Sequence, residues 1–291
     1  MRWICLFVMI MSVVVLPAQS SEVFFQAHRG GLKEVPENTL AAYRYAWDLK
    51  AIPEVDICAS ADNVIICIHD DTLKRTTNAD VNQDVPVTRL TFEEIRQWDA
   101  GSWFAPEYAG EKVPALEEVL QEMAVRKEAQ IYLDLKKVDL KQLAAMIAHY
   151  DVAERVIFCH NKIESCQTMH EAVPGLRTML WIGGKVPDIQ KKFRKAHEDG
   201  FKGLDQVQLH LHAAPEKDEG ISYLMEEAFL KEALEIANEA KIDLEVLPFE
   251  FDCTSLASLL DVGIRWYATD EPKRFVSCVD QWREHNPNDA K

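Results

Sequence analysis

Short apolar runs alternate with longer segments of helical period along most of the chain. Eight runs rich in Val, Ile, Leu and Phe predict strands: Val23–His28, Glu54–Cys58, Ile131–Leu135, Val156–His160, Leu176–Ile182, Leu204–Leu209, Leu244–Leu247 and Ile264–Ala268. Seven segments predict helices: Thr39–Lys50, Leu116–Lys127, Leu140–Tyr150, Lys162–Ala172, Ile189–Asp199, Leu224–Ala240 and Thr254–Leu260. This alternation over about 250 residues is typical of an α/β fold, the (β/α)8 TIM barrel.

A doubly wound parallel sheet is the structural alternative, because it also alternates strands with helices. That fold usually carries a nucleotide-binding signature after its first strand. No G-x-G-x-x-G sequence follows the first predicted strand, and no P-loop occurs in the chain. We therefore favour the barrel.

Residues 59–115 are long for a single connection between a strand and a helix, which indicates a small functional insertion after the second strand. The beginning of this segment reads as two strands around an Asp62-Asn63 turn. Antiparallel pairing about that turn would return His69 to the level of Glu54 and Asp56. The insertion thus supplies one candidate site residue.

The N-terminus has the order of residues found in secretory signal peptides. Arg2 precedes the apolar run Trp3–Leu16, and Ala18 and Ser20 fit the small-x-small cleavage rule. A membrane span needs about 20 apolar residues, so the run is short for an uncleaved anchor, which is the alternative. We expect residues 1–20 to be removed, leaving one domain at 21–291 without a membrane span, in a secreted or periplasmic protein.

The chain is acidic, with 48 Asp and Glu against 32 Lys and Arg and a formal net charge of −16. Nucleic acid is excluded as a partner, because binding to phosphate backbones depends on clustered basic residues. Six cysteines follow the predicted signal peptide, at 58, 67, 159, 166, 253 and 278. A domain of this size has enough core to fold without crosslinks, so we expect buried free thiols, with pairing left open.

Three carboxylates are predicted to meet at the mouth of the barrel, where strand ends converge. Glu54 and Asp56 are two residues apart on one strand, as are Asp134 and Lys136 on another, so each pair shares a face. Carboxylates enclosed together repel one another unless a cation lies among them. A hard divalent ion with oxygen ligands would resolve that repulsion.

The other polar strand ends complete a candidate catalytic site. Histidine side chains in general change charge near neutral pH, so His28 and His69 can act as base and acid on opposite sides of a scissile bond. Arg29 and Lys136 can neutralise a phosphate. Acid, base, cation and anion-binding groups together indicate metal-assisted cleavage of a phosphodiester.

The chain resembles the glycerophosphodiester phosphodiesterase family, whose motifs it carries in the family's order. These motifs are His28-Arg29-Gly30, Pro36–Leu40, Glu54-Val55-Asp56, His69–Thr77, Pro114–Glu118 and Leu133–Lys136. The resemblance is strong over residues 24–136 and thins afterwards to Ala268–Pro272. It implies a (β/α)8 barrel with the 59–115 insertion.

The activity implied by the resemblance is hydrolysis of a small-molecule glycerophosphodiester to glycerol 3-phosphate and an alcohol. The site residues that it implies are the catalytic His28 and His69, the metal ligands Glu54, Asp56 and Asp134, the phosphate contacts Arg29 and Lys136, and Glu37 and Asn38 beside them. The alternatives are phospholipase D-like cleavage of lysophospholipids forming a cyclic phosphate, and a catalytically weak barrel that only binds phosphodiesters. The alcohol and the oligomeric state are left open.

Departures from the family's pattern affect the metal and the alcohol. The third ligand is Asp134 where the family usually has Glu, and the shorter side chain favours Ca²⁺ over Mg²⁺, because Ca²⁺ tolerates irregular coordination. His160 follows the fourth strand where the family often has Ser-Phe, so we expect it to line the mouth. His210-x-His212 would fit a metal-dependent amidohydrolase only after the first strand, whereas it follows the sixth.

Overall fold

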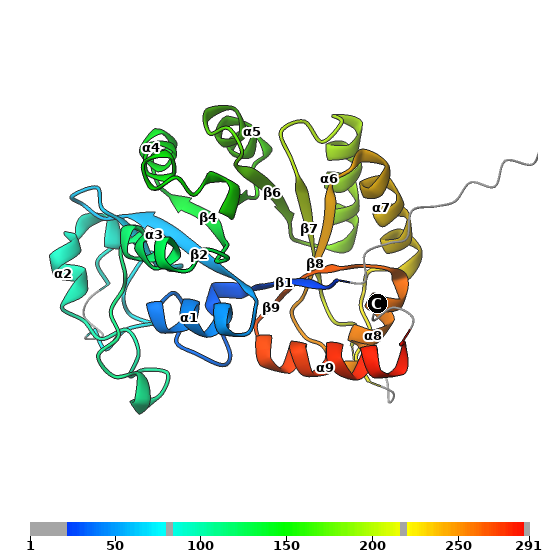
Figure 1. Ribbon diagram of the computed structural model, residues 1–291, viewed down its shortest axis with the longest axis horizontal. Coiled ribbons are helices and arrows are strands. Elements are labelled where there is room, and N and C mark those ends of the chain that lie inside the picture. Colours follow the sequence, from blue (N-terminus) through cyan, green and yellow to red (C-terminus); the bar gives the residue numbers. More distant parts are fainter. Residues whose placement is uncertain (1–21, 80–83, 216–219, 288–291) are drawn as a thin grey trace, which may run out of the picture.

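The computed structural model describes residues 22–79, 84–215 and 220–287, so the predicted signal peptide lies outside the described residues. Eight parallel strands form a closed barrel with helices around it (Figure 1). Closure is made by β1 (Phe24–Ala27), which pairs with β2 (Ile52–Ala59) on one side and with β9 (Trp266–Thr269) on the other. The structure therefore confirms the (β/α)8 barrel, since a doubly wound sheet has two open edges.

The other elements follow in chain order. The remaining strands are β3 (Ile65–Cys67), β4 (Ile131–Lys137), β5 (Val156–His160), β6 (Arg177–Ile182), β7 (Gln206–Leu211) and β8 (Asp243–Pro248). The α-helices are α1 (Leu40–Asp48), α2 (Phe92–Arg96), α3 (Leu116–Val125), α4 (Leu140–Tyr150), α5 (Ile163–Ala172), α6 (Val186–Glu198), α7 (Glu227–Ala240), α8 (Cys253–Val262) and α9 (Pro272–His285). Short 3₁₀ helices are η1 (His28–Gly30), η2 (Val87–Arg89), η3 (Pro106–Tyr108) and η4 (Ala153–Arg155).

All eight predicted barrel strands are present, with ends shifted by a few residues. Helix α9, which follows the last predicted strand, was not among the predicted helices. Pro272 opens α9 at a position where its missing N–H costs nothing, and Phe275, Val279 and Trp282 are buried along one face. The helical period of these buried positions is visible in the sequence, so α9 was predictable from the pattern.

Two kinds of core fill the barrel, as the alternation of side chains along each strand requires. Residues such as Val55, Leu133 and Phe158 face the helices and belong to one large apolar cluster. The interior is more polar. A buried hydrogen-bonded layer crosses it below the mouth, formed by Gln26, Tyr132, Gln206, Gln208 and Glu245.

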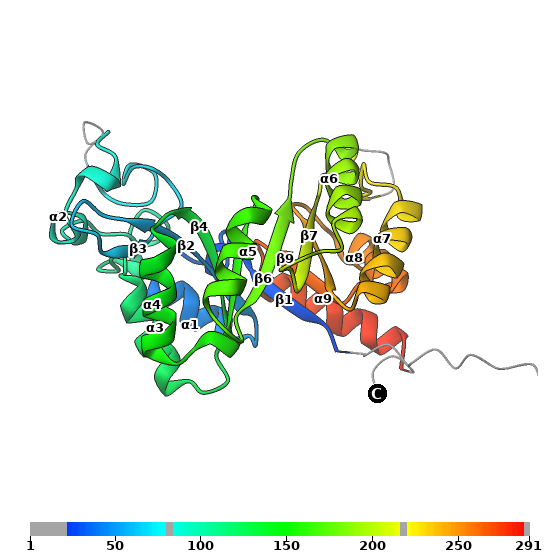
Figure 2. The same cartoon turned by 90° about the horizontal axis from the view of Figure 1, so that it is seen from above.

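The insertion begins as the predicted hairpin. Strand β3 is antiparallel to β2, with Ile57 opposite Cys67, and Asn63 in the turn has a left-handed backbone (φ 60°). Just after β3, the Ile68 amide donates to the Asp56 carbonyl at 2.9 Å, so His69 follows at the level of the carboxylates. The segment with α2 lies beside β2 and β3, on the side of the barrel away from α6 and α7 (Figures 1 and 2).

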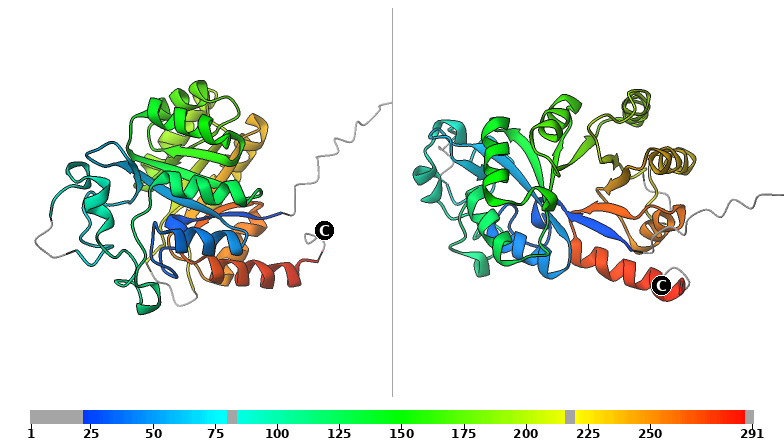
Figure 3. Two further views of the ribbon diagram at one scale, coloured as in Figure 1. Left: turned by 60° about the vertical axis from the view of Figure 1, so that its left-hand side comes forward. Right: turned by 45° about the horizontal axis from the view of Figure 1, so that its top comes forward.

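The last two helices, α8 and α9, lie side by side (Figure 3) and are joined by a disulfide between Cys253 and Cys278, whose Cα atoms are 4.8 Å apart. The expectation that all cysteines would be free was wrong for this pair. Its partners become neighbours only when both helices pack on the barrel, and the spacing along the sequence does not reveal this. The other four cysteines of the described chain, at 58, 67, 159 and 166, are free and buried as expected.

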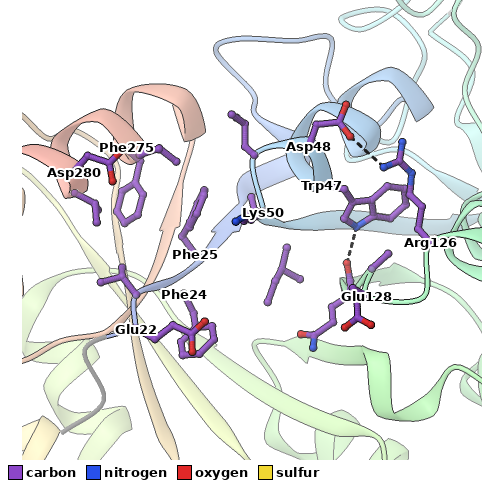
Figure 4. A pocket seen from close by; sticks show the side chains of 18 of the residues that line it. Glu22, Phe24, Phe25, Trp47, Asp48, Lys50, Arg126, Glu128, Phe275 and Asp280 are labelled. Atoms are coloured by element: carbon purple, nitrogen blue, oxygen red, sulfur yellow. Dashed lines mark hydrogen bonds and ion pairs between the residues drawn. The ribbon is translucent and has the colours of Figure 1, made fainter. Parts of the chain in front are cut away.

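A cavity of about 890 Å³ lies at the N-terminal ends of β1, β2 and β4 (Figure 4). It is lined by Phe24, Phe25, Trp47, Arg126 and Phe275, among others, and Trp47 Nε1 donates to the Gln130 carbonyl at 2.9 Å beside it. In TIM barrels the active site lies at the opposite, C-terminal end of the strands. None of the helices in the described ranges combines the length and apolar composition needed to cross a membrane.

Candidate active site

The predicted metal carboxylates converge from two neighbouring strands, Glu54 and Asp56 from β2 and Asp134 from β4. Asp56 on β2 stands opposite Asp134 on β4 in the parallel register, and Glu54 lies one pleat earlier on the same face as Asp56. One oxygen from each carboxylate lies within 4.8 Å of one from each of the others. All three side chains are buried, so the sequence-based prediction that they share one enclosed face is met by the structure.

The electrostatics of this cluster reflect crowded negative charge. Burial raises the pKa of Glu54 to about 7, with Asp56 and Asp134 acting in the same direction and His28 opposing them. Burial also raises the pKa of Asp134, although Lys136 opposes it. Burial also acts to raise the pKa of Asp56. There, however, the effects of Lys136, His69 and Arg29 are larger, and the pKa of Asp56 is lowered. The three carboxylates together therefore favour the binding of a proton or a cation.

One oxygen of Asp56 supports a cation site. Asn38 holds the other oxygen, Oδ2, by a 2.7 Å bond from its Nδ2, and Asn38 is itself fixed by the Tyr43 hydroxyl at 2.9 Å. Oδ1 is buried and accepts no hydrogen bond from the described residues, although Lys136 Nζ lies 2.9 Å away as an ion pair. A buried carboxylate oxygen with this unmet capacity, beside the carboxylates of Glu54 and Asp134, fits a hard divalent cation.

The two predicted phosphate contacts lie against the carboxylates. Lys136 Nζ pairs with both Asp56 and Asp134, and these two with Glu54 raise its pKa against the effect of burial. Arg29 follows β1 with a left-handed backbone (φ 54°), and its Nε lies 3.7 Å from Asp56 Oδ2. Both cations are therefore held at the carboxylate cluster rather than pointing into solvent.

Glu37 holds two arginines. Its Oε1 accepts from Arg29 at 3.1 Å, and Arg75 contacts both oxygens, at 2.5 and 2.8 Å. Glu37 is buried with its acceptors directed at these guanidiniums, so any part that it takes in substrate binding passes through them. Arg75 lies within the His69–Thr77 motif, and the sequence pattern does not predict its contact with Glu37.

His28 is oriented by a residue that sequence reasoning missed. Its Nδ1 lies 2.6 Å from Asp270 Oδ1, and its Nε2 lies 3.7 Å from Glu54 Oε2, so Nε2 faces the carboxylates. Burial lowers the pKa of His28, but Glu54 and Asp270 outweigh it and the net shift is upward. Asp270 directly follows the last strand, and the strand-end rule that selected His28 could have selected it too.

His69 is oriented in the same way. Its Nδ1 lies 2.8 Å from Asp70 Oδ1, and Arg75 donates two hydrogen bonds to the Asp70 carboxylate, at 2.7 and 2.8 Å. These bonds from Arg75, with His69, lower the pKa of Asp70 and keep it a carboxylate. Because Arg75 also pairs with Glu37, the insertion that carries His69 is tied to the barrel at this point.

The far side of the mouth is formed by β5 to β8. Alternation places Cys159, in register with Asp134, inside the barrel. The next residue, His160, then belongs to the other side of β5, and this does not support the expectation that it lines the mouth. His210 lies inside with its ring stacked on Trp181, and His212 is exposed. The three carboxylates are the only group of His, Cys, Asp or Glu in the described ranges close enough to hold an ion. The amidohydrolase alternative therefore has no support.

Comparisons with known proteins identify the family of the chain. The sequence profile of the Glycerophosphoryl diester phosphodiesterase family matches residues 28–273. The chain belongs to this family. The matched range begins at His28 and ends just beyond Asp270, so it contains both members of the pair that closes the site.

Relatives in the family cover nearly the whole chain. A glycerophosphodiester phosphodiesterase of Caldanaerobacter subterraneus is 35% identical over 265 residues, which are 87% of this chain and 96% of that protein. The crystal structure of a glycerophosphodiester phosphodiesterase from Agrobacterium tumefaciens superposes with a TM-score of 0.69 at 25% identity, covering 88% and 99% of the two chains. An Oleispira antarctica phosphodiesterase in complex with sn-glycerol-3-phosphate has the same fold, with a TM-score of 0.66, 21% identity and coverage of 90% and 100%.

Proposed function

We propose that this enzyme hydrolyses glycerophosphodiesters to glycerol 3-phosphate and an alcohol, with a divalent metal ion and two histidines. The observation that carries the proposal is the arrangement of the mouth. Three buried carboxylates lie beside His28 and His69, and each histidine is oriented by its own aspartate. The relatives named above support the choice of substrate class.

Glu54, Asp56 and Asp134 would hold the metal ion. When bound, the ion would polarise a phosphoryl oxygen as a Lewis acid and offset the charge that develops on phosphorus. With Arg29 and Lys136, the three carboxylates leave a formal charge of −1. A divalent ion would turn this into +1, which is the sign needed to hold a phosphodiester anion on the surface of an acidic protein.

The histidines would carry the proton transfers. One Nε2 accepts a proton from the attacking water oxygen while its bond to phosphorus forms, and the other donates a proton to the alcohol oxygen as its bond to phosphorus breaks. Asp270 and Asp70 hold the two Nδ1 atoms, so each ring keeps its Nε2 free for this work. One proton is taken up by the first histidine and one is given by the second, so the first must release its proton and the second must regain one, through solvent, before the next turnover.

The direct test is turnover of glycerophosphocholine by the mature chain. We expect His28→Ala and His69→Ala each to lower kcat by at least about a hundredfold, the scale of general acid–base help. His149→Ala, which removes an exposed histidine from α4, is the matched control and keeps full activity. Normal turnover by a folded His28 or His69 variant would remove that residue from the mechanism. Phosphorus NMR of the products separates hydrolysis from release of a cyclic phosphate.

We propose Ca²⁺ as the ion, because Asp134 reaches less far than the family's usual Glu and Ca²⁺ accepts longer bonds, of about 2.3–2.6 Å, in irregular geometry. Chelation is expected to abolish activity, and Ca²⁺ to restore it at least as well as Mg²⁺. Asp134→Glu should be tolerated and Asp134→Ala should not. Activity of the alanine variant after exhaustive chelation would contradict a metal site here, and rescue by Mg²⁺ alone would contradict the choice of ion.

We also propose that the protein is exported, with cleavage near Ser21. The disulfide between Cys253 and Cys278 supports this, because disulfides persist in oxidising compartments outside the cytosol. N-terminal sequencing of protein from the native host tests the proposal. Recovery of soluble protein that retains Met1 would contradict it.

A further inference from the structure

Asp134 accepts a hydrogen bond that has no role in the metal chemistry proposed above. The indole Nε1 of Trp181, at the end of β6, donates to Asp134 Oδ1 at 3.0 Å. The other oxygen, Oδ2, pairs with Lys136. A carboxylate oxygen has two acceptor positions, so both oxygens keep one free for a cation. The direction of those free positions is set by the two donors.

Trp181 is in turn held by His210 from β7. The two rings are stacked 5.3 Å apart and only 6° from parallel, and Phe249 meets His210 edge-on at 5.1 Å. The ring of His210 also has little room beside Gly183. A Cβ built on Gly183 would lie 2.6 Å from His210 Nδ1, which is closer than real Cβ atoms approach.

His210 is fixed from below by the buried polar layer. Its Nε2 lies 3.1 Å from Gln208 Oε1, and Gln208 Nε2 donates to Gln26 at 2.9 Å and also to Glu245. Gln208 and Glu245 are buried and bonded to further members of the layer. A continuous series of contacts therefore runs from the interior of the barrel through His210 and Trp181 to a candidate metal ligand.

We propose that Trp181 is a positioning residue that presents Asp134 to the metal ion, with His210 as its support. The proposal rests on the metal-dependent function proposed above. Asp134 is one methylene shorter than a glutamate, so it reaches the ion shared with Glu54 and Asp56 only from a restricted set of orientations. The indole bond selects among these, because a stacked, hydrogen-bonded ring holds one rotamer. Outer-shell partners of this kind commonly change metal affinity by about ten- to a hundredfold.

Calcium affinity measured by calorimetry on the metal-free mature chain tests this without relying on turnover. Trp181→Phe keeps an aromatic ring on His210 but removes the donor, and we expect Ca²⁺ binding about ten- to a hundredfold weaker. Trp103→Phe is the matched control, since it removes an indole bond to a backbone carbonyl in the insertion. It should bind Ca²⁺ like the wild type. Melting temperatures in chelator check that each variant folds.

A double variant separates positioning from space filling. In Trp181→Phe/Asp134→Glu, the longer carboxylate no longer depends on the indole, so most of the lost affinity should return. Gly183→Ala, whose backbone lies outside the left-handed region, should push His210 away and weaken Ca²⁺ binding in the same direction as Trp181→Phe.

The outcomes are distinct. Wild-type affinity in Trp181→Phe would overturn the role of Trp181, and a loss that the double variant does not recover would show that Trp181 only fills space. Unchanged affinity in Gly183→Ala would overturn the supporting role of His210. A wild type that binds neither Ca²⁺ nor Mg²⁺ would overturn the proposed metal site itself, and this proposal with it.

Discussion

Glu245 gives the barrel a pH-dependent stability that can be measured apart from catalysis. Its carboxyl group is fully buried in the polar layer, where it pairs with Tyr132, Gln206 and Gln208. Burial raises its pKa to about 8 from the ordinary value of 4.5, against the opposing effect of the bonds from Gln208 and Tyr132. The folded chain therefore keeps a proton that the unfolded chain releases.

The sign and the size follow from this difference. Because the folded state binds the extra proton between pH 4.5 and 8, stability falls as the pH rises through that window. The full difference corresponds to about 5 kcal/mol, at 1.36 kcal/mol for each pKa unit. About 3 kcal/mol of it is lost between pH 5 and pH 8.

Urea unfolding of the wild type and of Glu245→Gln at pH 5, 6, 7 and 8, all in chelator, measures the effect. The glutamine does not titrate, so the wild type should lose about 3 kcal/mol more than the variant over this range, whatever the constant offset between them. Glu239→Gln, an exposed substitution on α7, is the control and should follow the wild type. Parallel pH profiles for the wild type and Glu245→Gln would refute the reasoning.

Two further predictions concern residues in the C-terminal part of the chain. Asp270→Asn removes the carboxylate from His28 Nδ1 and should lower kcat by on the order of a hundredfold, with Ca²⁺ affinity in calorimetry kept within about twofold. A loss confined to metal affinity would contradict an orienting role. Replacing Cys253 and Cys278 by Ser opens a crosslink over 25 residues and should lower the free energy of unfolding by about 3 kcal/mol. Equal urea midpoints for the two proteins would contradict this.

The barrel and its carboxylates could be predicted because both depend on short periods in the sequence. Glu54 and Asp56 are two residues apart on a strand, and that spacing alone places them on one face. The hairpin turn at Asn63 likewise fixes where the chain returns toward them. Such features need no knowledge of which strands become neighbours.

The remaining site contacts depend on neighbours that local spacing does not specify. Trp181 meets Asp134 because β6 and β4 lie two places apart around a closed ring and because stacking on His210 selects one indole orientation. Asp270 follows a strand just as His28 does. Its contact with His28 could not be predicted, however, because it depends on the pairing of β1 with β9 that closes the barrel. The pairing of Cys253 with Cys278 depends similarly on how two helices pack.

The contact between His28 and Asp270 also bears on the stage of folding at which turnover arises. The two residues are 242 positions apart, one after the first barrel strand and the other after the last. A growing chain can therefore contain the carboxylates, Lys136 and His69 long before His28 acquires its partner. Recovery of turnover during refolding would report the joining of β1 to β9 rather than the earlier collapse of the chain. An unfinished or C-terminally truncated chain lacks the Asp270 partner of His28. On the mechanism proposed above, full turnover would therefore require the complete ring of strands.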